Sequence, residues 1–186
     1  MKPYAIPPFC FPTTVAFIDD NRSFLESIAL GLDSRLAFRK FESPFSALVA
    51  LNGAPPTPSI DEELLSIYRH RGECSQSHHV IDVNLDKIHR VVHDEQRFEQ
   101  ISVVVVDYDM PEINGLDLCR SIKNPAIRKI LLTGKADEQV GIHAFNEGII
   151  DRFIKKQYPD AIARLNTAIA DLQKEYLQQL QDALIH

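Results

Sequence analysis

The chain has 186 residues, of which 45% are hydrophobic and 25% charged, as is usual for a globular protein of one domain plus an embellishment. Its net charge of −6 argues against a basic surface, so we expect this segment to make no direct contact with nucleic acid. No apolar stretch approaches the roughly 18 residues that a membrane span needs. We therefore expect no membrane contact. The three cysteines are scattered and give no disulfide framework, so we expect a cytoplasmic protein.

Two strand–helix units are predicted near the N-terminus, behind a proline-rich extended arm at residues 1–13. The first strand ends in Asp19 and Asp20, and Asn21 is well suited to cap the helix that follows. The second helix is expected to begin at Pro44, because proline is favoured in the first turn of a helix. The predicted elements are strands at 14–18 and 36–41 and helices over about 22–32 and 44–51.

A polar, histidine-rich insertion is predicted at residues 53–100, between the second and third strands of the sheet. We expect it to be mainly helical, with helices at 61–70 and 84–98 on either side of a loop at 71–79. Five of the seven histidines lie in it, but the paired cysteines typical of a structural zinc site are absent. Its role is left open between a polar cover for the sheet and a docking surface for a partner.

Regular alternation returns in the C-terminal half of the chain. The predicted strands are at 102–106, 129–132 and 152–154, and the predicted helices are at 116–122, 137–146 and 160–184. Five repeats of strand and helix predict an α/β fold, with a parallel sheet covered by helices on both faces. The last helix is longer than such a sheet needs. Residues 176–186 are therefore expected to form an extension that supports a homodimer, leads to an output domain or folds back on the domain.

Polar groups follow four of the predicted strands, at the point where each strand ends. They are Asp19, Asp20, Asp107, Thr133 and Lys156. Because the C-terminal ends of parallel strands share one edge of a sheet, we expect these side chains to lie together. Three crowded carboxylates call for a bound cation, and ligands that are all oxygen suit Mg²⁺. Asp107, which ends a run of four valines, is then the candidate nucleophile, and Thr133 and Lys156 are candidates to hold phosphoryl oxygens.

Four stretches of the chain carry motifs that occur together in one protein family. They are Val-Ala-Phe-Ile-Asp-Asp-Asn at 15–21, Val-Val-Val-Val-Asp-Tyr-Asp-Met-Pro-Glu-Ile-Asn-Gly-Leu at 103–116, Ile-Leu-Leu-Thr-Gly at 130–134 and Ala-Phe-Asn-Glu-Gly-Ile-Ile-Asp-Arg-Phe-Ile-Lys-Lys at 144–156. These motifs resemble the receiver domain of two-component response regulators, over about residues 14–52 and 100–175. The resemblance implies a flavodoxin-like, doubly wound sheet of five parallel strands in a receiver domain at 14–175.

The resemblance implies a role for each acidic residue, carried over by position. Asp107 would be the phosphoacceptor and would also contact the metal. Asp20 would bind Mg²⁺ directly, and Asp19 mainly through water. Asp109 would offer its backbone carbonyl to the same ion.

The resemblance also implies a set of residues that respond to the phosphoryl group. Thr133 would be the switch hydroxyl that moves onto the phosphate, and Phe153 the aromatic switch residue. The phosphate-binding lysine is either Lys156 or Lys155, and the alignment that puts Phe153 at the aromatic position favours Lys156. The proline that usually follows this lysine is replaced by Gln157.

The function implied by the resemblance is signalling. A sensor histidine kinase or a phosphotransfer protein would phosphorylate Asp107 in the presence of Mg²⁺, and the change would be read by a downstream output domain or protein. Such a chain is not an enzyme, because it catalyses only its own phosphorylation and dephosphorylation. Two alternatives stay open. Asp107-Tyr108-Asp109 after a strand also resembles the Mg²⁺-dependent phosphatases of the haloacid dehalogenase type, and a phosphorylation-independent interaction module is the other.

Overall fold

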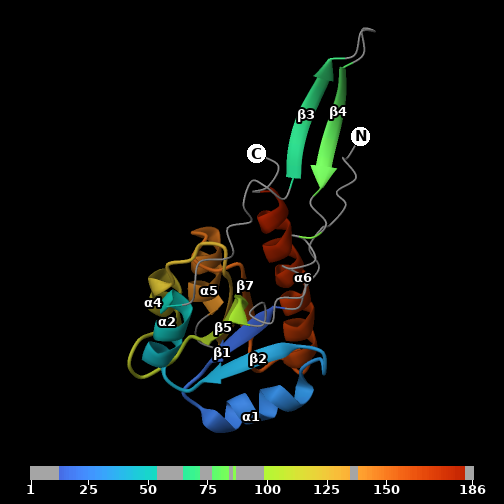
Figure 1. Ribbon diagram of the computed structural model, residues 1–186. Coiled ribbons are helices and arrows are strands. Elements are labelled where there is room, and N and C mark those ends of the chain that lie inside the picture. Colours follow the sequence, from blue (N-terminus) through green and yellow to red (C-terminus); the bar gives the residue numbers. More distant parts are fainter. Residues whose placement is uncertain are drawn as a thin grey trace.

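A parallel sheet of five strands lies at the centre of the fold (Figure 1). The structure is a computed structural model that describes residues 13–53, 65–71, 77–83, 86, 99–134 and 138–182. The strands of the sheet are β1 (Thr14–Ile18), β2 (Ala37–Phe41), β5 (Ile101–Asp107), β6 (Arg128–Thr133) and β7 (Arg152–Lys155). Their order is β2-β1-β5-β6-β7, and all neighbours are parallel, which confirms the predicted doubly wound α/β fold.

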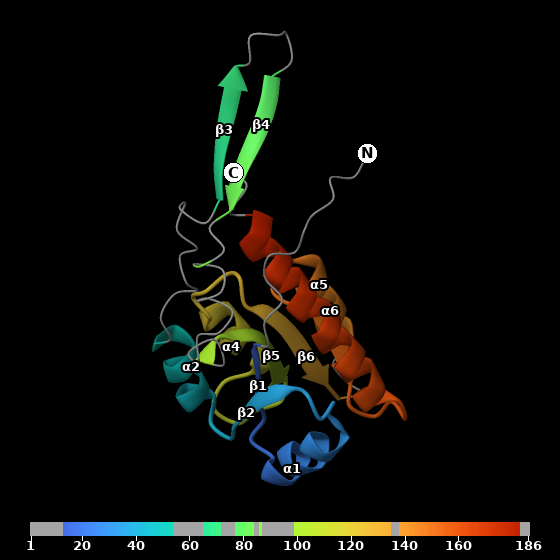
Figure 2. The ribbon, with the colours of Figure 1, turned by 45° about the vertical axis from the view of Figure 1, so that its right-hand side comes forward.

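Helices cover both faces of this sheet (Figures 1 and 2). The helices are α1 (Arg22–Gly31), α2 (Pro44–Gly53), α4 (Gly115–Ser121), α5 (Glu138–Asn146) and α6 (Ala161–Asp182). The helices α1 and α6 pack on one face, while α2, α4 and α5 pack on the other. Asn21 caps α1 as predicted, because its side-chain oxygen accepts a hydrogen bond from the backbone N–H of Phe24.

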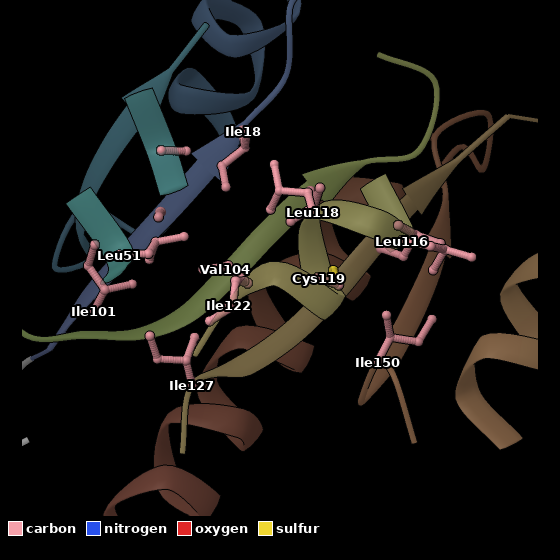
Figure 3. Packing of buried hydrophobic residues seen from close by; sticks show 14 of the residues in the cluster. Ile18, Leu51, Ile101, Val104, Leu116, Leu118, Cys119, Ile122, Ile127 and Ile150 are labelled. Atoms are coloured by element: carbon pink, nitrogen blue, oxygen red, sulfur yellow. The ribbon is translucent and has the colours of Figure 1, made fainter. Parts of the chain in front are cut away.

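The valine run places the core on both sides of β5, whose seven residues are all buried. Val104 and Val106 belong to the cluster under α2, α4 and α5 (Figure 3), and Val103 and Val105 to the cluster under α1 and α6. Alternate residues of a strand point to opposite faces, so a continuous apolar run fits a strand that is covered twice. Cys119, in the first of these clusters, is a free thiol whose pKa burial raises to about 12, so it acts as a small apolar group.

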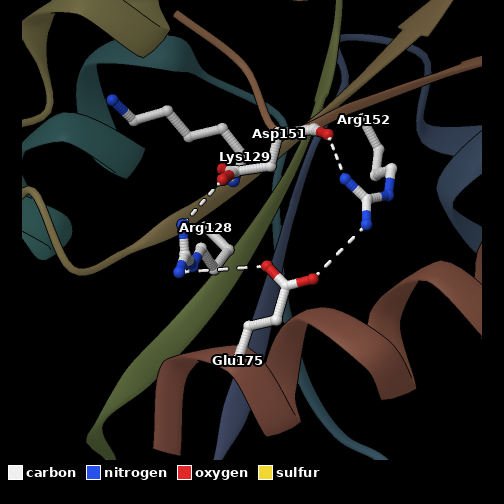
Figure 4. Close-up of polar contacts among 5 residues, drawn as sticks. All are labelled: Arg128, Lys129, Asp151, Arg152 and Glu175. Atoms are coloured by element: carbon white, nitrogen blue, oxygen red, sulfur yellow. Dashed lines mark hydrogen bonds and ion pairs between the residues drawn. The ribbon is translucent and has the colours of Figure 1, made fainter. Parts of the chain in front are cut away.

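The long helix α6 is fixed over the sheet by apolar and ionic contacts. Leu165, Ile169, Leu172 and Tyr176 are buried. Near Tyr176, the Glu175 carboxylate lies 3.3 Å from Arg152 and 3.8 Å from Arg128, which is also paired with Asp151 at 2.9 Å (Figure 4). These groups lie at the N-terminal ends of β6 and β7, so they hold the helix at the edge of the sheet opposite to the predicted site.

The predicted helix at residues 61–70 is wrong over most of its length. Residues Leu65–Arg71 form β3, which pairs with β4 (Ser77–Val83) in an antiparallel hairpin, and this hairpin extends away from the main sheet in Figures 1 and 2. Ile67 lies opposite Ile81 in this register. β-Branched residues favour strands over helices, and here this propensity outweighs the short helical spacing of Leu64, Leu65 and Tyr68. The predicted helix at 84–98 lies, apart from residue 86, outside the described residues, as do residues 1–12.

The order of the strands creates one place where a ligand site is expected. The chain winds from β1 outward to β2, and then from β5 outward through β6 to β7. The direction of winding therefore changes between β1 and β5, and open α/β sheets bind ligands at the C-terminal ends of the strands beside such a switch point. Within the described part of the chain, none of the helices combines the length and apolar character that a membrane span requires.

Candidate functional site

Three carboxylates meet at the switch point between β1 and β5. Asp19 and Asp20 follow the last residue of β1, and Asp107 is the last residue of β5. Each offers an oxygen, and these three oxygens all lie within 4.8 Å of one another. Asp19 and Asp107 are buried, whereas Asp20 is exposed. The structure therefore brings together the three acids that the sequence placed at strand ends.

The chain that enters α1 orients the buried carboxylate of Asp19. Its Oδ1 accepts a hydrogen bond of 2.8 Å from the backbone N–H of Asn21. Asn21 in turn accepts from the backbone N–H of Phe24 at 3.1 Å and so caps the helix. The second oxygen of Asp19, Oδ2, is left to point at the other groups of the site, where it meets Lys156.

Among the residues that the structure describes, Lys156 is the cation that contacts this cluster. Its Nζ lies 2.7 Å from Asp19 Oδ2 and 3.0 Å from Asp107 Oδ1. Lys155, by contrast, holds its Nζ 5.5 Å from the centre of the Tyr158 ring. Lys155 is the last residue of β7 and Lys156 is the next residue, so the two side chains leave the backbone in opposite directions. The two candidate lysines therefore differ in their surroundings, since Lys156 contacts two carboxylates of the site and Lys155 contacts an aromatic ring.

Thr133 ends β6 beside Asp107, and its hydroxyl is fully buried. Within the residues that the structure describes, its Oγ1 has no hydrogen-bond partner. A buried hydroxyl without a partner is destabilising, by about 1–3 kcal/mol, so this oxygen is poised to bond with a group that enters the site. The backbone carbonyl of Thr133 accepts from the N–H of Lys156 at 3.0 Å, which ties the two strand ends together.

Phe153 and Asp109 occupy less central positions. Phe153 lies on β7 and packs, partly buried, against the cluster under α2, α4 and α5. Gly141 of α5 leaves space for its ring, since a Cβ there would lie 3.2 Å from two ring atoms. Asp109 is exposed, two residues after Asp107.

Gly115 is a site residue whose importance the sequence reasoning missed. A Cβ at this position would collide with the carbonyl oxygen of Asp107, and would lie 3.0 Å from both the carbonyl carbon of Asp107 and Cδ1 of Leu131. The N–H of Gly115 donates to the carbonyl of Tyr108 at 2.9 Å. The start of α4 is therefore pressed against the strand end that carries Asp107. The signal was a glycine in the first turn of a helix, where glycine is a poor helix former.

Phe24 is the second residue that the sequence reasoning missed. It lies in the first turn of α1 and packs, partly buried, against the cluster under α1 and α6. Its ring centre, however, lies 4.1 Å from Nζ of Lys156. No sequence signal identified this contact, because residues 24 and 156 come together only through the fold.

Among the described residues, the cluster carries more negative charge from its carboxylates than positive charge from its lysine. Burial raises the pKa of the Asp107 carboxyl above its usual range. The Lys156 ammonium opposes this shift and the Asp19 carboxylate adds to it. Of the groups that the structure describes here, one ammonium thus faces three carboxylates. Because all the donors of the cluster are oxygens, they suit a hard divalent cation such as Mg²⁺.

Replacing Asp107 with asparagine is expected to stabilise the fold at neutral pH when no metal is present. The folded protein holds the Asp107 proton more tightly than the unfolded chain does, so this residue stabilises most below the ordinary carboxyl pKa of about 4. That contribution is lost as the pH rises through the raised folded pKa. At pH 7, Asp107→Asn should gain about 1 kcal/mol, a rise in Tm of roughly 2–4 °C.

Thermal unfolding of Asp107→Asn and the wild type in a chelator, from pH 4 to pH 8, measures this effect. The gain should shrink towards pH 4. The exposed Asp171 on α6 provides the control, because Asp171→Asn removes a carboxylate that stays in water. An Asp107→Asn variant that is no more stable than the wild type at pH 7 would contradict the expected cost of burying this acid.

Comparison with known proteins gives matches to one family. The family described as the response regulator receiver domain matches residues 63–170, a stretch that includes Asp107, Thr133 and Lys156 but begins after Asp19 and Asp20. The response regulator SaeR of Staphylococcus aureus is 31% identical over 85 residues, which are 44% of this chain and 37% of SaeR. This chain therefore spans little more than a third of the length of that curated relative.

Solved structures agree with this match. The response regulator LqsR of Legionella pneumophila is 41% identical with a TM-score of 0.76, over 97% of this chain and 50% of the LqsR chain. A response regulator receiver domain protein from Clostridium thermocellum is 21% identical with a TM-score of 0.58, over 89% of this chain and 98% of its own. The second structure supports the fold alone, while the first is similar over nearly the whole chain.

Proposed function

Because the chain belongs to the response regulator receiver domain family, we propose that Asp107 accepts a phosphoryl group from a histidine kinase or a phosphotransfer protein. The observation that carries this proposal is the contact of 3.0 Å between Asp107 and Lys156, inside a cluster of three carboxylates. A lone buried carboxylate without a partner would destabilise the fold. Here the acid has a cation beside it and further acids that suit a metal.

The chemistry that we propose is an in-line transfer. An oxygen of the Asp107 carboxylate attacks the phosphorus of the donor and a new oxygen–phosphorus bond forms. The bond between phosphorus and the rest of the donor breaks, and its electron pair stays with the departing group. Lys156 offsets the negative charge on the phosphoryl oxygens. Mg²⁺, when bound, supplies further positive charge there, and we assign it to Asp20, Asp107 and the Asp109 carbonyl, with Asp19 acting mainly through water.

The proposed response to phosphorylation begins at Thr133. Its buried hydroxyl lacks a partner among the described residues, and a phosphoryl oxygen on Asp107 would give it one. Movement of Thr133 towards the phosphoryl group would open space for the Phe153 ring, which packs against the α5 side of the sheet. The two arrangements form a switch that a phosphoryl group biases through differential contacts.

The output of the switch lies with a partner in this proposal. The chain spans 37% of SaeR and half of LqsR. We propose that a downstream domain or protein reads the switched surface, that the end of α6 supports a homodimer, and that the protein works in the cytoplasm. The chain would catalyse only its own phosphorylation and dephosphorylation.

Incubation with a small phosphodonor such as acetyl phosphate tests the proposal. Intact mass spectrometry should detect one added phosphate per chain in the presence of Mg²⁺ and almost none in a chelator. The phosphatase alternative predicts a different result, namely continuous release of product from a generic phosphate ester without a stoichiometric limit. Steady turnover of such an ester, or the same amount of labelling with and without Mg²⁺, would contradict the proposed receiver function.

A further inference from the structure

We propose that Phe24 is a positioning residue for phosphoryl transfer, whose ring holds the Lys156 ammonium against Asp19 and Asp107. The ring centre of Phe24 lies 4.1 Å from Nζ of Lys156. That nitrogen also lies 2.7 Å from Asp19 and 3.0 Å from Asp107. The ammonium therefore has an aromatic face in addition to its two carboxylates. This inference rests on the proposed function, because it concerns the group that offsets phosphoryl charge.

One turn of backbone supplies both the ring and the buried acid that hold Lys156. The N–H of Asn21 fixes Asp19 by donating to Oδ1, and the side chain of Asn21 accepts from the N–H of Phe24. Phe24 is partly buried and packs with the cluster under α1 and α6, which restrains its ring. The ring and the carboxylate thus belong to a single rigid unit, the capped start of α1.

The strength of the contact follows from its distance and its surroundings. A cation within about 6 Å of an aromatic ring centre is attracted to the negative face of the ring, and more so where water is excluded. The other such contacts among the described residues are longer, at 4.8 Å for Arg164, 5.5 Å for Lys155 and 6.0 Å for Arg39. Of these four contacts, the Lys156 contact is the one that involves a cation of the acid cluster.

The ring restricts where a flexible side chain can place its charge. A lysine carries its ammonium on four rotatable bonds, and freezing these bonds before the reaction removes an entropy cost from the transfer step. In Phe24→Leu, a side chain of similar apolar character keeps the core packed but loses the aromatic face. The ammonium then samples more positions, and fewer of them lie against Asp107.

The test measures the rate of labelling by acetyl phosphate at saturating Mg²⁺ on the full chain. Phe24→Leu should label about threefold to tenfold more slowly than the wild type, which is the loss of rate expected when a cation–aromatic contact of ordinary strength is removed. Phe24→Tyr keeps an aromatic face and should restore most of the rate. Replacement of Phe24 by phenylalanines with increasing fluorine content should lower the rate stepwise, because fluorine withdraws the negative charge of the ring while its shape is kept.

A double variant separates positioning from packing. In a Lys156→Met background, Phe24→Leu should cause no further loss of rate, because the residue that it positions is gone. An equal loss in both backgrounds would show that Phe24 acts through the fold alone and would overturn the inference. Labelling of Phe24→Leu at the wild-type rate would overturn it too. Failure of the proposed function looks different, because the wild type itself would then not be labelled.

Discussion

Gly115→Ala is expected to lower the free energy of unfolding by about 2–3 kcal/mol and to reduce phosphoryl labelling strongly, a change at the upper end of overpacking effects. The new methyl group would collide with the carbonyl oxygen of Asp107, and it would also press on Cδ1 of Leu131. A side chain can rotate away from such a collision, whereas the backbone carbonyl of a residue that is paired into the sheet cannot. Either α4 or the end of β5 must therefore shift.

The chain offers a matched control for this change. Gly53 is the last residue of α2, and among the described residues beyond its own helix no atom lies within 4 Å of where its Cβ would stand. Gly53→Ala should leave stability equal or slightly higher, because alanine is a better helix former than glycine by about 1 kcal/mol. Urea unfolding of both variants measures the difference. Equal unfolding midpoints for Gly115→Ala and the wild type would contradict the close approach of α4 to Asp107.

Lys156→Met is expected to slow labelling of Asp107 by about 100-fold, the usual cost of removing one charged or hydrogen-bonding group that stabilises a transition state. The same change should strengthen Mg²⁺ binding. The ammonium lies 2.7 Å from Asp19 and 3.0 Å from Asp107, so its charge opposes a cation that uses the same carboxylates. A variant that binds Mg²⁺ more tightly yet reacts more slowly is hard to explain by damage to the fold.

Lys155→Met is the control for this prediction. Its ammonium lies over the Tyr158 ring and away from the acid cluster, at 5.5 Å from the ring centre. Both the rate of labelling and the affinity for Mg²⁺, measured by titration calorimetry, should stay near those of the wild type. If Lys155→Met were the slower of the two variants, the assignment of Lys156 as the phosphate-binding lysine would be wrong.

The central sheet was predictable because its signals are local. The four valines of β5 predict a strand that is buried on both faces, and the structure buries all seven residues of that strand. The cap of α1 is local too, since Asn21 bonds to the helix that follows it. The hairpin of β3 and β4 was not predicted. Its pairing joins residues on two strands, and a short apolar run carries no unambiguous period.

The set of side chains that the fold brings together in the site was predictable only in part. Strand ends that share one edge placed Asp19, Asp107 and Thr133 together, because topology alone determines that edge. The choice between Lys155 and Lys156 depends on where each side chain goes after β7 ends, and a one-residue change of register reverses it. The contact of Phe24 with Lys156 joins residues from opposite ends of the chain, so no spacing in the sequence could predict it.

The location of the phosphoryl group is the most direct test of the account. The full chain would be labelled with acetyl phosphate and Mg²⁺, reduced with borohydride to trap the acyl phosphate, digested and sequenced by tandem mass spectrometry. The account predicts a single modified residue, Asp107, and no labelling of Asp107→Asn, even though that variant is expected to be the more stable protein. A modified residue elsewhere, or undiminished labelling of Asp107→Asn, would contradict the assignment of Asp107 as the phosphoacceptor.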